Sequence, residues 1–400
     1  MSSPAIKLQR LSKTYRVSRK APGLAGALRG FVRRDYVDRS AVRDLTFEVG
    51  QGEFVGLIGP NGAGKTTTLK MLSGVLHPTS GEAFVLGHVP WRRSPAFLEQ
   101  IGFVMGQKGQ LWWELPAWDT FLLIKEMYGL ETAAFRDRVA ELSASLGVRD
   151  LLDVQVRKLS LGERMKCELI AALLHRPSLI FLDEPTIGLD IASQRAVREF
   201  LRMENATRRT TIVLTSHQIA DIEQLCRRVI VISSGEVIHD GSLASLRARL
   251  GDKRLVRITP KLSARAEEVR ACREWLTGLA LKATGGGRNA GPGGAGRATA
   301  TGQAARPGGA GPTPAEAPPD LAAPLLDEGG VLTLRLPGRL ARLVAAEALS
   351  HPAVEDVELR EPPLEEAVAA LFAGAGTPSA LEPGPGGIPD REPAAPGDER

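Results

Sequence analysis

The residues most suited to chemistry in this chain lie between positions 59 and 66. There the sequence reads Gly59-Pro60-Asn61-Gly62-Ala63-Gly64-Lys65-Thr66, which matches the pattern G-x-x-x-x-G-K-[ST] at every fixed position. Glycines allow such a loop to curl so that several backbone N–H groups face phosphate oxygens. Lys65 supplies positive charge for the β- and γ-phosphates, and Thr66 offers a hydroxyl to Mg²⁺. This stretch therefore predicts that the chain binds a nucleotide through its phosphates.

An acidic pair further along the chain adds the groups that hydrolysis would need. Asp183 and Glu184 directly follow the apolar run 179–182, which the sequence predicts to be a buried strand. Ligands of open α/β sheets bind outside the carboxyl ends of the strands. We therefore expect Asp183 to hold Mg²⁺ through water and Glu184 to orient and deprotonate an attacking water. The alternative is an exposed pair without a role, which the phosphate-binding loop upstream disfavours.

These residues require a sheet that brings several strand ends together. Up to about residue 250 strand-like and helix-like segments alternate, which predicts an α/β sheet domain. The phosphate-binding loop lies between a strand and a helix that begins near Thr66, so the phosphates would meet the positive end of a helix dipole. Two helix-rich stretches between 115 and 152 separate this loop from the acidic pair. The predicted buried strands are 54–58, 179–182, 211–215 and 229–232.

The composition is that of a globular protein with a mild excess of basic residues. The 400 residues are enough for two or three domains. The net charge of +5 permits contact with anionic lipid or nucleic acid but requires neither. Cys167, Cys226 and Cys272 form no metal-binding or disulfide pattern, which favours a reducing compartment. We expect neither a signal peptide nor a transmembrane span, so work at a membrane would require a partner.

A second, smaller α+β domain is predicted after residue 250, formed by 251–283 and 328–375. Between 284 and 324, 18 of 41 residues are Gly or Pro and none is aromatic, so this stretch lacks the apolar surface needed to fold. We therefore expect 284–327 and the tail at 376–400 to be disordered. The elements predicted in the second domain are strands at 255–258, 331–336 and 354–359 and helices at 264–281, 339–350 and 363–372.

A basic segment interrupts the beginning of the chain at 16–39. One interpretation is a solvated surface loop, and a second is a basic patch that touches lipid headgroups. Nucleic acid is less favoured because aromatic residues are not interleaved with the charges. Two acidic residues, Asp35 and Asp38, accompany seven basic ones, Arg16, Arg19, Lys20, Arg29, Arg33, Arg34 and Arg39.

A further motif lies between the phosphate-binding loop and the acidic pair, at Leu159-Ser160-Leu161-Gly162-Glu163, and leads into a predicted helix at 164–175. With these motifs in this order, the chain resembles the ATP-binding subunit of ABC transporters, whose signature reads LSGGQ. The resemblance implies that Ser160, the Gly162 backbone and Glu163 act on ATP held by a second copy of the subunit. Two residues depart from the signature: Leu161 is bulky where the family has Gly, and Glu163 is charged where the family has Gln.

Four other residues match family positions, and the resemblance gives each a role. Gln107 resembles the glutamine that senses Mg²⁺ and the attacking water. Asp190, at the end of 186–190, would cross the interface between two copies. His217 follows a predicted strand and would contact the γ-phosphate. Tyr15 matches the aromatic residue on which adenine stacks.

The resemblance covers residues 5 to about 245 and implies the P-loop NTPase fold of ABC ATPases at 1–250, with a helical subdomain at about 110–175. It implies catalytic roles for Glu184, His217, Lys65 and Gln107 and metal contacts from Thr66, Gln107 and Asp183. The implied ATP contacts are Tyr15, Gly59, Pro60, Asn61, Gly62, Ala63, Gly64, Lys65, Thr66 and Thr67.

The implied function is coupling of ATP-driven closure and hydrolysis to transport by a separate membrane permease. The branch that the chain resembles serves exporters, which implies a peripheral protein at the cytoplasmic face of the membrane and no nucleic-acid partner. Trp112, Trp113 and Trp118 are either anchors for a permease helix or core residues of the helical segment. An importer ATPase, or a soluble ABC-type ATPase without a permease, is the alternative. A translation ATPase would carry two cassettes, and a chromosome-type ATPase a long coiled coil.

Overall fold

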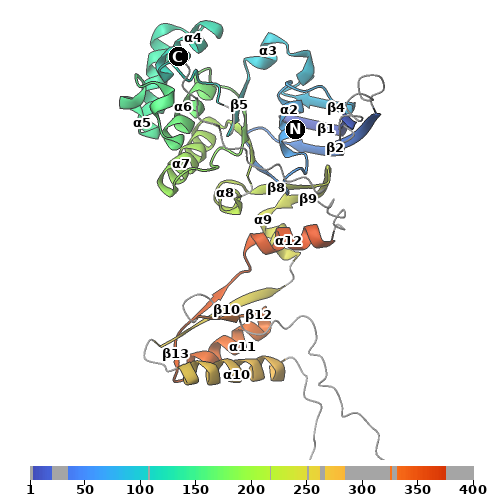
Figure 1. Cartoon of the computed structure of the whole chain (residues 1–400), viewed down its shortest axis with the longest axis vertical. Coiled ribbons are helices and arrows are strands. Elements are labelled where there is room, and N and C mark those ends of the chain that lie inside the picture. Colours follow the sequence, from blue (N-terminus) through green and yellow to red (C-terminus); the bar gives the residue numbers. More distant parts are fainter. Residues whose placement is uncertain are drawn as a thin grey trace, which may run out of the picture.

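The fold was taken from a computed structural model, which describes residues 3–19, 35–106, 109–216, 218–249, 252–261, 266–283, 325–326 and 331–374. The chain has an upper part that contains two sheets and most of the helices, and a lower part built on a third sheet (Figure 1). None of the described helices has both the length and the apolar content needed to cross a bilayer.

The central sheet of the upper part has six strands in the order β5-β6-β7-β3-β8-β9. All neighbours are parallel except β8 and β9, which pair antiparallel. The middle residues of the parallel strands are apolar and mostly buried, because both faces of the sheet are covered. The four strands predicted from the sequence all lie here. The bounds are β5 Ile101–Met105, β6 Leu179–Asp183, β7 Thr211–Thr215, β3 Phe54–Ile58, β8 Arg228–Ser233 and β9 Glu236–Ser242.

The register of this sheet places the predicted chemical groups at one edge. Thr215 at the end of β7 pairs with Asp183 on one side and with Leu57 of β3 on the other. The helix α2, Lys65–Leu72, begins at the loop that leaves β3. The acidic pair and the phosphate-binding loop therefore emerge side by side, as expected for carboxyl ends of parallel strands.

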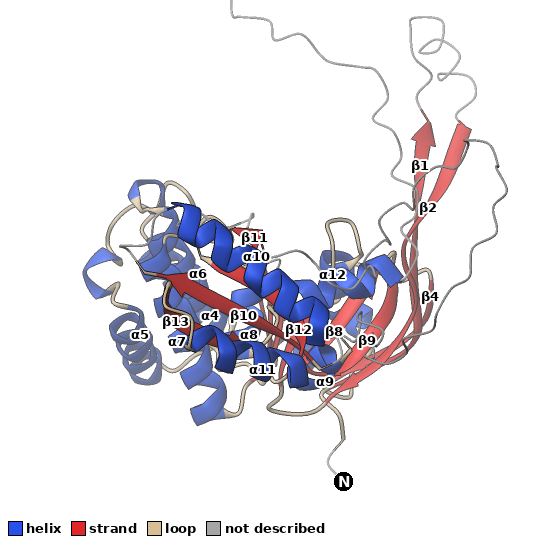
Figure 2. Cartoon of the chain, turned by 90° about the horizontal axis from the view of Figure 1, so that it is seen from below, coloured by secondary structure: helices blue, strands red, loops and turns tan. Residues whose placement is uncertain are grey.

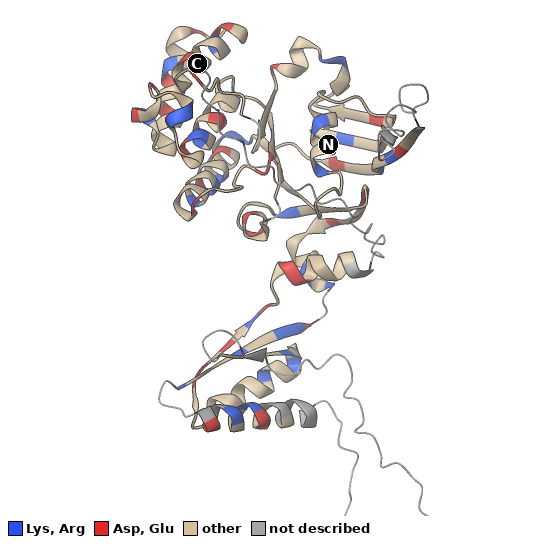
Figure 3. Cartoon of the chain, in the orientation of Figure 1, with Lys and Arg blue, Asp and Glu red and all other residues tan. Residues whose placement is uncertain are grey.

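An antiparallel sheet, ordered β2-β1-β4, lies beside the central one and shows that the two ends of the segment 16–39, one interpretation of which was a surface loop, are strand. Residues 16–19 and 35–39 continue two long strands, which extend past β4 (Figure 2). Charges of both signs occur along this hairpin (Figure 3). Arg16 lies opposite Asp38, and its guanidinium is 4.7 Å from the centre of the Tyr36 ring. Cross-strand pairs of this kind stabilise the pairing of two strands. A count of charges in the segment does not predict such pairs. Residues 20–34 lie outside the described part. The bounds are β1 Ile6–Arg19, β2 Asp35–Val49 and β4 Ser80–Val85.

The helical segment, at about 110–175, lies in the sequence between the phosphate-binding loop and the acidic pair. It packs into the core shared with the central sheet. Its last helix, α6, begins at Leu161 and ends at Leu173, whereas the sequence predicted 164–175. The earlier start follows from a capping box, in which Ser160 and Glu163 satisfy the first free N–H groups of the helix. Between α2 and the start of the lower part, the helices are α3 Pro95–Leu98, α4 Ala117–Met127, α5 Thr132–Leu146, α6, α7 Ile191–Arg208, α8 Ile219–Leu225 and α9 Leu243–Ala248, with 3₁₀ turns at Pro90–Arg92, Arg149–Leu151 and Val156–Lys158.

The lower part is a four-stranded antiparallel sheet in the order β11-β12-β10-β13, with α10 and α11 on one face (Figures 1 and 2). The chain order β-α-β-β-α-β with this strand order is the split βαβ, or ferredoxin-like, arrangement. Alternate residues of the strands, such as Val256 and Leu334, are buried in its core. The bounds are β10 Lys253–Pro260, α10 Ala266–Ala283, β11 Leu325–Leu326, β12 Leu332–Pro337, α11 Gly338–Leu349 and β13 Val354–Arg360.

Two features of the lower part differ from the sequence-based division. Leu325 and Leu326, expected in the disordered stretch 284–327, instead pair with Thr333 and Leu332 of β12. The apolar dipeptide adds an edge strand, a contact that composition alone does not reveal. The last helix, α12 (Leu364–Gly374), was expected in the second domain, yet its buried residues pack with α8 and α9 in the core of the upper part. The rest of 284–327 and the tail at 376–400 lie outside the described residues.

Candidate nucleotide-binding and hydrolysis site

A cavity of about 440 Å³ contains the phosphate-binding loop. It is formed by the β1–β2 hairpin on one side, by the loop and the start of α2 below, and by the end of β6 on the other side. Its lining residues are Tyr15, Val17, Arg39, Ser40, Ala41, Asn61, Gly62, Ala63, Gly64, Lys65, Thr66, Thr67 and Glu184. A second hollow of similar size lies near the amino ends of β6 and β7 and contains none of these groups.

The glycines of the loop are required for two different reasons. A Cβ at Gly59 would lie 2.3 Å from the carbonyl oxygen of Ile232, and one at Gly64 would lie 2.5 Å from that of Ala41. At these positions neighbouring backbone, rather than a ligand, excludes a side chain. Gly62 has open space around it but a φ of 82°, which L-residues rarely adopt. Glycine at this position therefore allows the loop to curl so that its N–H groups face inward.

Lys65 is buried at the base of the cavity. Its Nζ donates hydrogen bonds to the carbonyl oxygens of Gly59, at 2.7 Å, and Pro60, at 3.2 Å. Burial lowers the pKa of the Lys65 ammonium, whereas the carboxylates of Glu184 and Asp183 act in the opposite direction. A buried ammonium is stabilised by a nearby anion, so Lys65 is suited to bind a phosphate group in this cavity.

Oxygen atoms from three segments converge beside Lys65. The Thr66 hydroxyl donates to Asp183 Oδ1 at 3.1 Å, and the Thr215 hydroxyl donates to the same oxygen at 2.7 Å. Hydroxyl and carboxylate oxygens are the ligands that Mg²⁺ prefers. Thr66 and Asp183, two of the three residues expected to hold this ion, thus lie within hydrogen-bonding distance of each other.

Glu184 is held in an uncommon backbone conformation at the end of β6. Its φ is 55°, a region that costs a non-glycine residue on the order of 1–3 kcal/mol. Its N–H donates to the carbonyl and the hydroxyl oxygen of Thr215, each at 3.1 Å. Gly106 packs so tightly against it that a Cβ there would lie 2.2 Å from the Glu184 carbonyl oxygen. These contacts fix a strained residue in the wall of the cavity, a common situation at functional sites.

Tyr15 stands on β1 at the outer wall of the same cavity and is 38% exposed. The Lys13 ammonium lies 5.5 Å from the centre of its ring. An exposed ring beside a phosphate-binding loop offers a stacking surface for a base. The continuation of β1 and β2 adds Val17 and Arg39 to this wall, neither of which the sequence analysis assigned to it.

The residues of the signature motif lie on a different surface, because none of them is among the residues that line the cavity. Ser160 caps α6, and its N–H and its hydroxyl both donate to Glu163 Oε2 at 2.8 Å. Gly162 lies against the first turn of α7, where a Cβ would be 2.3 Å from Ser193 Oγ and 3.4 Å from a carboxylate oxygen of Asp190. Signature and Asp190 thus form one surface, while the loop and the acidic pair form another.

Gln107 and His217 lie outside the described residues, so the structure says nothing of their position. A residue that the sequence analysis missed, Glu168, holds the segment after Gln107. Its buried carboxylate accepts the N–H groups of Gln110, at 3.0 Å to each oxygen, and Leu111, at 3.3 Å. Burial raises its pKa. An acidic residue among apolar neighbours on the buried side of α6 was the signal that could have revealed it.

An apolar groove of about 400 Å³ lies between the central sheet and the helical segment. Trp112 lines it and is 55% exposed, together with residues of α4 such as Leu123 and Met127. Trp113 is also exposed, and the Arg164 guanidinium lies 5.4 Å from its ring centre. Trp118 instead packs against the core, tilted on Phe135 at 5.7 Å. The three tryptophans therefore differ: the first two are open to a partner, and the third is structural.

Comparison with known proteins assigns this architecture to one family. Residues 42–187 match the family model described as ABC transporter. The chain is 37% identical over 206 residues to the ABC transporter ATP-binding protein NatA of Bacillus subtilis, which covers 52% of this chain and 83% of that protein. It is 33% identical over 228 residues to the linearmycin resistance ATP-binding protein LnrL of the same organism, covering 57% of this chain and 73% of that protein.

A solved structure agrees with the sequence relatives. The structure of the ATP-binding subunit of an ABC transporter matches with a TM-score of 0.51 and 26% identity, over 62% of this chain and 93% of that chain. The predicted fold class, a P-loop NTPase of the ABC type, is thereby confirmed. The chain belongs to the ABC transporter family, as an ATP-binding subunit that hydrolyses ATP.

Proposed function

We propose that two copies of this chain enclose ATP between them and drive an export permease from the cytoplasmic face of the membrane. One observation carries the proposal: Ser160, Gly162 and Asp190 lie on a surface separate from the cavity that contains Lys65. A signature that cannot reach the ATP of its own chain can act on that of a partner. Each copy then contributes half of every site, as in a symmetric dimer with an isologous interface.

Mixing two inactive variants tests this arrangement. Lys65→Ala removes the phosphate contact, and Ser160→Ala removes the signature hydroxyl. A mixed dimer keeps one site with an intact loop and an intact signature, so ATP turnover should return in the mixture to about a quarter of the wild-type rate. Each variant alone should be inactive. A mixture as inactive as its components would contradict the shared site.

Magnesium fits the oxygen atoms at the end of β6. Thr66 and Asp183 provide a hydroxyl and a carboxylate oxygen 3.1 Å apart, a hard donor pair of the kind that binds Mg²⁺ together with phosphate. The bound ion would neutralise charge on the β- and γ-phosphates. Thr215, which donates to the same carboxylate oxygen, holds Asp183 in orientation. Gln107 is proposed as a further contact of this ion.

In the proposed reaction Glu184 orients a water molecule and accepts its proton as the water oxygen bonds to the γ-phosphorus. The bond to the β,γ-bridging oxygen breaks, and ADP leaves. Lys65 and His217 stabilise the charge on the transferring phosphoryl group, and loop N–H groups face its oxygens. The position of Glu184 in the wall of the cavity that contains Lys65 supports this assignment. Adenine is proposed to stack on Tyr15.

The proposed permease contact is the groove beside Trp112. Exposed aromatic and methionine side chains at the rim of an apolar hollow favour a helix of a membrane protein. The resistance function named for one relative supports export as the direction. Peripheral attachment at the cytoplasmic face follows from such a partner, and nucleic acid is not expected to bind.

Glu163 affects how firmly two copies close. Its carboxylate occupies the N-terminus of α6 and holds the Ser160 hydroxyl, so it competes with an incoming γ-phosphate through charge and through the hydrogen bond. Glu163→Gln should strengthen ATP-driven dimerisation on the order of tenfold, measured as the ATP dependence of dimer mass. Weaker dimerisation in this variant would show that the carboxylate assists closure.

Leu161→Gly tests the other departure from the family signature. Unchanged activity in this variant would mean that the site accommodates Leu161.

The stretch 284–324 is not expected to contribute to ATP hydrolysis. It leaves α10 at Ala283 and returns at β11, so a short Gly/Ser linker could join the same elements. A chain with this replacement should hydrolyse ATP within about twofold of the wild-type rate. Loss of most of the turnover in a folded variant would assign the stretch a regulatory role.

A further inference from the structure

A buried carboxylate outside the nucleotide cavity joins the two chain segments that carry the proposed hydrolytic groups. Asp221, on α8, is fully buried, and both of its oxygens are paired. Oδ2 accepts the hydroxyls of Thr186, at 2.5 Å, and Ser216, at 3.0 Å. Oδ1 accepts Nη1 of Arg198 at 2.7 Å. One side chain thus connects the turn after β6, the helix α7 and the end of β7.

The first connected segment follows the acidic pair. Thr186 is two residues after Glu184 and four before Asp190. It is buried, and its carbonyl oxygen accepts the N–H of Leu189 at 3.3 Å, while the Glu184 carbonyl accepts the N–H of Ile187 at 3.3 Å. The segment is therefore a tight turn fixed at its centre by Asp221. A shift of Thr186 would be transmitted to Glu184 through one intervening residue, Pro185.

The second segment ends β7. Ser216 directly precedes His217 in the sequence. Its hydroxyl donates to Asp221 and accepts the N–H of Gln218 at 3.0 Å, so the residues on both sides of position 217 are held by one hydroxyl group. Ser216 and Gln218, which flank His217 in the sequence, are therefore fixed relative to Asp221.

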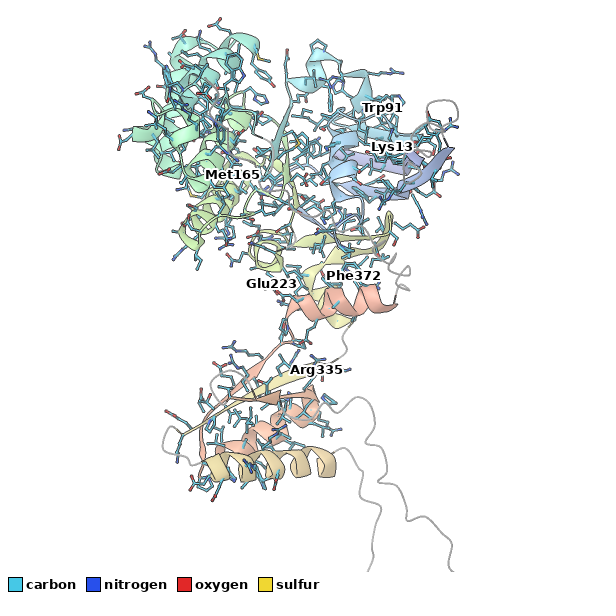
Figure 4. The ribbon with its side chains drawn as sticks, in the orientation of Figure 1. Lys13, Trp91, Met165, Glu223, Arg335 and Phe372 are labelled. Atoms are coloured by element: carbon cyan, nitrogen blue, oxygen red, sulfur yellow. The ribbon has the colours of Figure 1, made fainter. Side chains whose placement is uncertain are left out.

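An ion pair holds Asp221 itself, and further contacts hold the helix that carries it. Arg198 anchors it to α7, the helix whose N-terminus is capped by Asp190. From outside, α12 packs on α8 and α9, and Arg247 joins Glu223 of α8, at 2.5 Å, to Glu361, at 3.3 Å. Figure 4 labels Glu223 and Phe372 at this junction. The short helix that carries Asp221 is thus held on both sides.

We propose that Asp221 is a positioning residue for hydrolysis, which sets Thr186 and Ser216 so that Glu184 and His217 address one phosphate. The proposal rests on the roles given above to Glu184 and His217. Asp221 itself touches no residue that lines the nucleotide cavity, except through these segments. It therefore acts on turnover and not on ATP binding, since small displacements of catalytic groups cost rate more than affinity.

Variants that each remove one hydrogen bond to Asp221 distinguish a positioning role from a structural one. Thr186→Val and Ser216→Ala each remove one hydroxyl and keep the Asp221–Arg198 ion pair. Each should lower kcat about tenfold with the Kd for ATP within twofold of wild type. Asp221→Asn should lower kcat about a hundredfold. The two hydroxyl variants keep the test decisive even if Asp221→Asn fails to fold. Glu199→Gln, an amide replacement at an exposed position of the neighbouring helix α7, is the matched control and should keep the wild-type kcat.

The result that would overturn the proposal is a normal kcat, within twofold of wild type, in folded Thr186→Val and Ser216→Ala. A parallel loss of ATP affinity and turnover would also overturn it, because Asp221 would then support the fold alone. The mixing experiment with Lys65→Ala and Ser160→Ala tests the proposed function separately. Restored activity there, with unaffected hydroxyl variants here, would reject only the role of Asp221.

Discussion

Glu184→Gln is expected to lower ATP turnover at least a hundredfold while ATP still binds. The amide keeps the shape of the side chain but cannot accept a proton from water, and loss of a positioned base typically costs 10²–10⁴ in rate. Glu184 lines the cavity near the buried Lys65 ammonium, and its backbone is fixed by Thr215. The measurement is the rate of phosphate release at saturating ATP, together with the Kd for ATP from equilibrium titration.

The matched control for this variant is Glu48→Gln. Glu48 is exposed on β2 and pairs with Lys7 at 2.9 Å, away from the cavity. Surface pairs of this kind contribute little to stability, so turnover should not change. Retained turnover in Glu184→Gln would exclude Glu184 as the base and direct attention to another acceptor.

Lys65→Ala is expected to weaken ATP binding by about a hundredfold or more, since truncating one partner of a buried charge pair costs roughly 2–5 kcal/mol. The ammonium is buried at the base of the cavity and bonds to two loop carbonyls, so its removal takes away the charge and also loosens the loop. Equilibrium titration with ATP measures the effect.

Lys70→Ala is the control for this second variant. Lys70 lies on the same helix, α2, but outside the lining of the cavity, and its removal should leave the Kd for ATP within about twofold. Equal affinity in Lys65→Ala and the wild type would contradict the place given to Lys65 at the phosphates.

The parts of the fold that the sequence predicted are those set by local pattern. Apolar runs such as 54–58 became strands of the central sheet, and residues of the loop motif at 59–66 line the cavity described above. The helices and strands of the second domain were found within a few residues, since alternation and helical periodicity are local signals. The ends of elements were predicted less accurately. In the upper part, α6 begins at Leu161 and not at 164, because the capping box was not recognised in the sequence.

The parts that the sequence did not reveal depend on pairing between distant segments. The continuation of β1 and β2 through Arg16 and Asp38 required knowing which strand lies opposite. Leu325 and Leu326 gain an edge position only because β12 is already in place. In the sequence Asp221 has the pattern of a polar residue on a surface helix. Its role depends on Thr186 and Ser216, whose hydroxyls contact it only in the folded chain. Tertiary structure decides each of these positions, and local pattern does not.

The signature surface and the nucleotide cavity are separate in one copy of the chain. The central claim is therefore that two copies form a dimer with ATP between them. The most direct measurement is the mass of Glu184→Gln in solution, by light scattering on a sizing column, with and without ATP and Mg²⁺. Trapped ATP should hold two copies together, so we expect the mass of a dimer with ATP and that of a monomer without it. A monomeric mass at ATP concentrations that saturate binding would contradict the shared site.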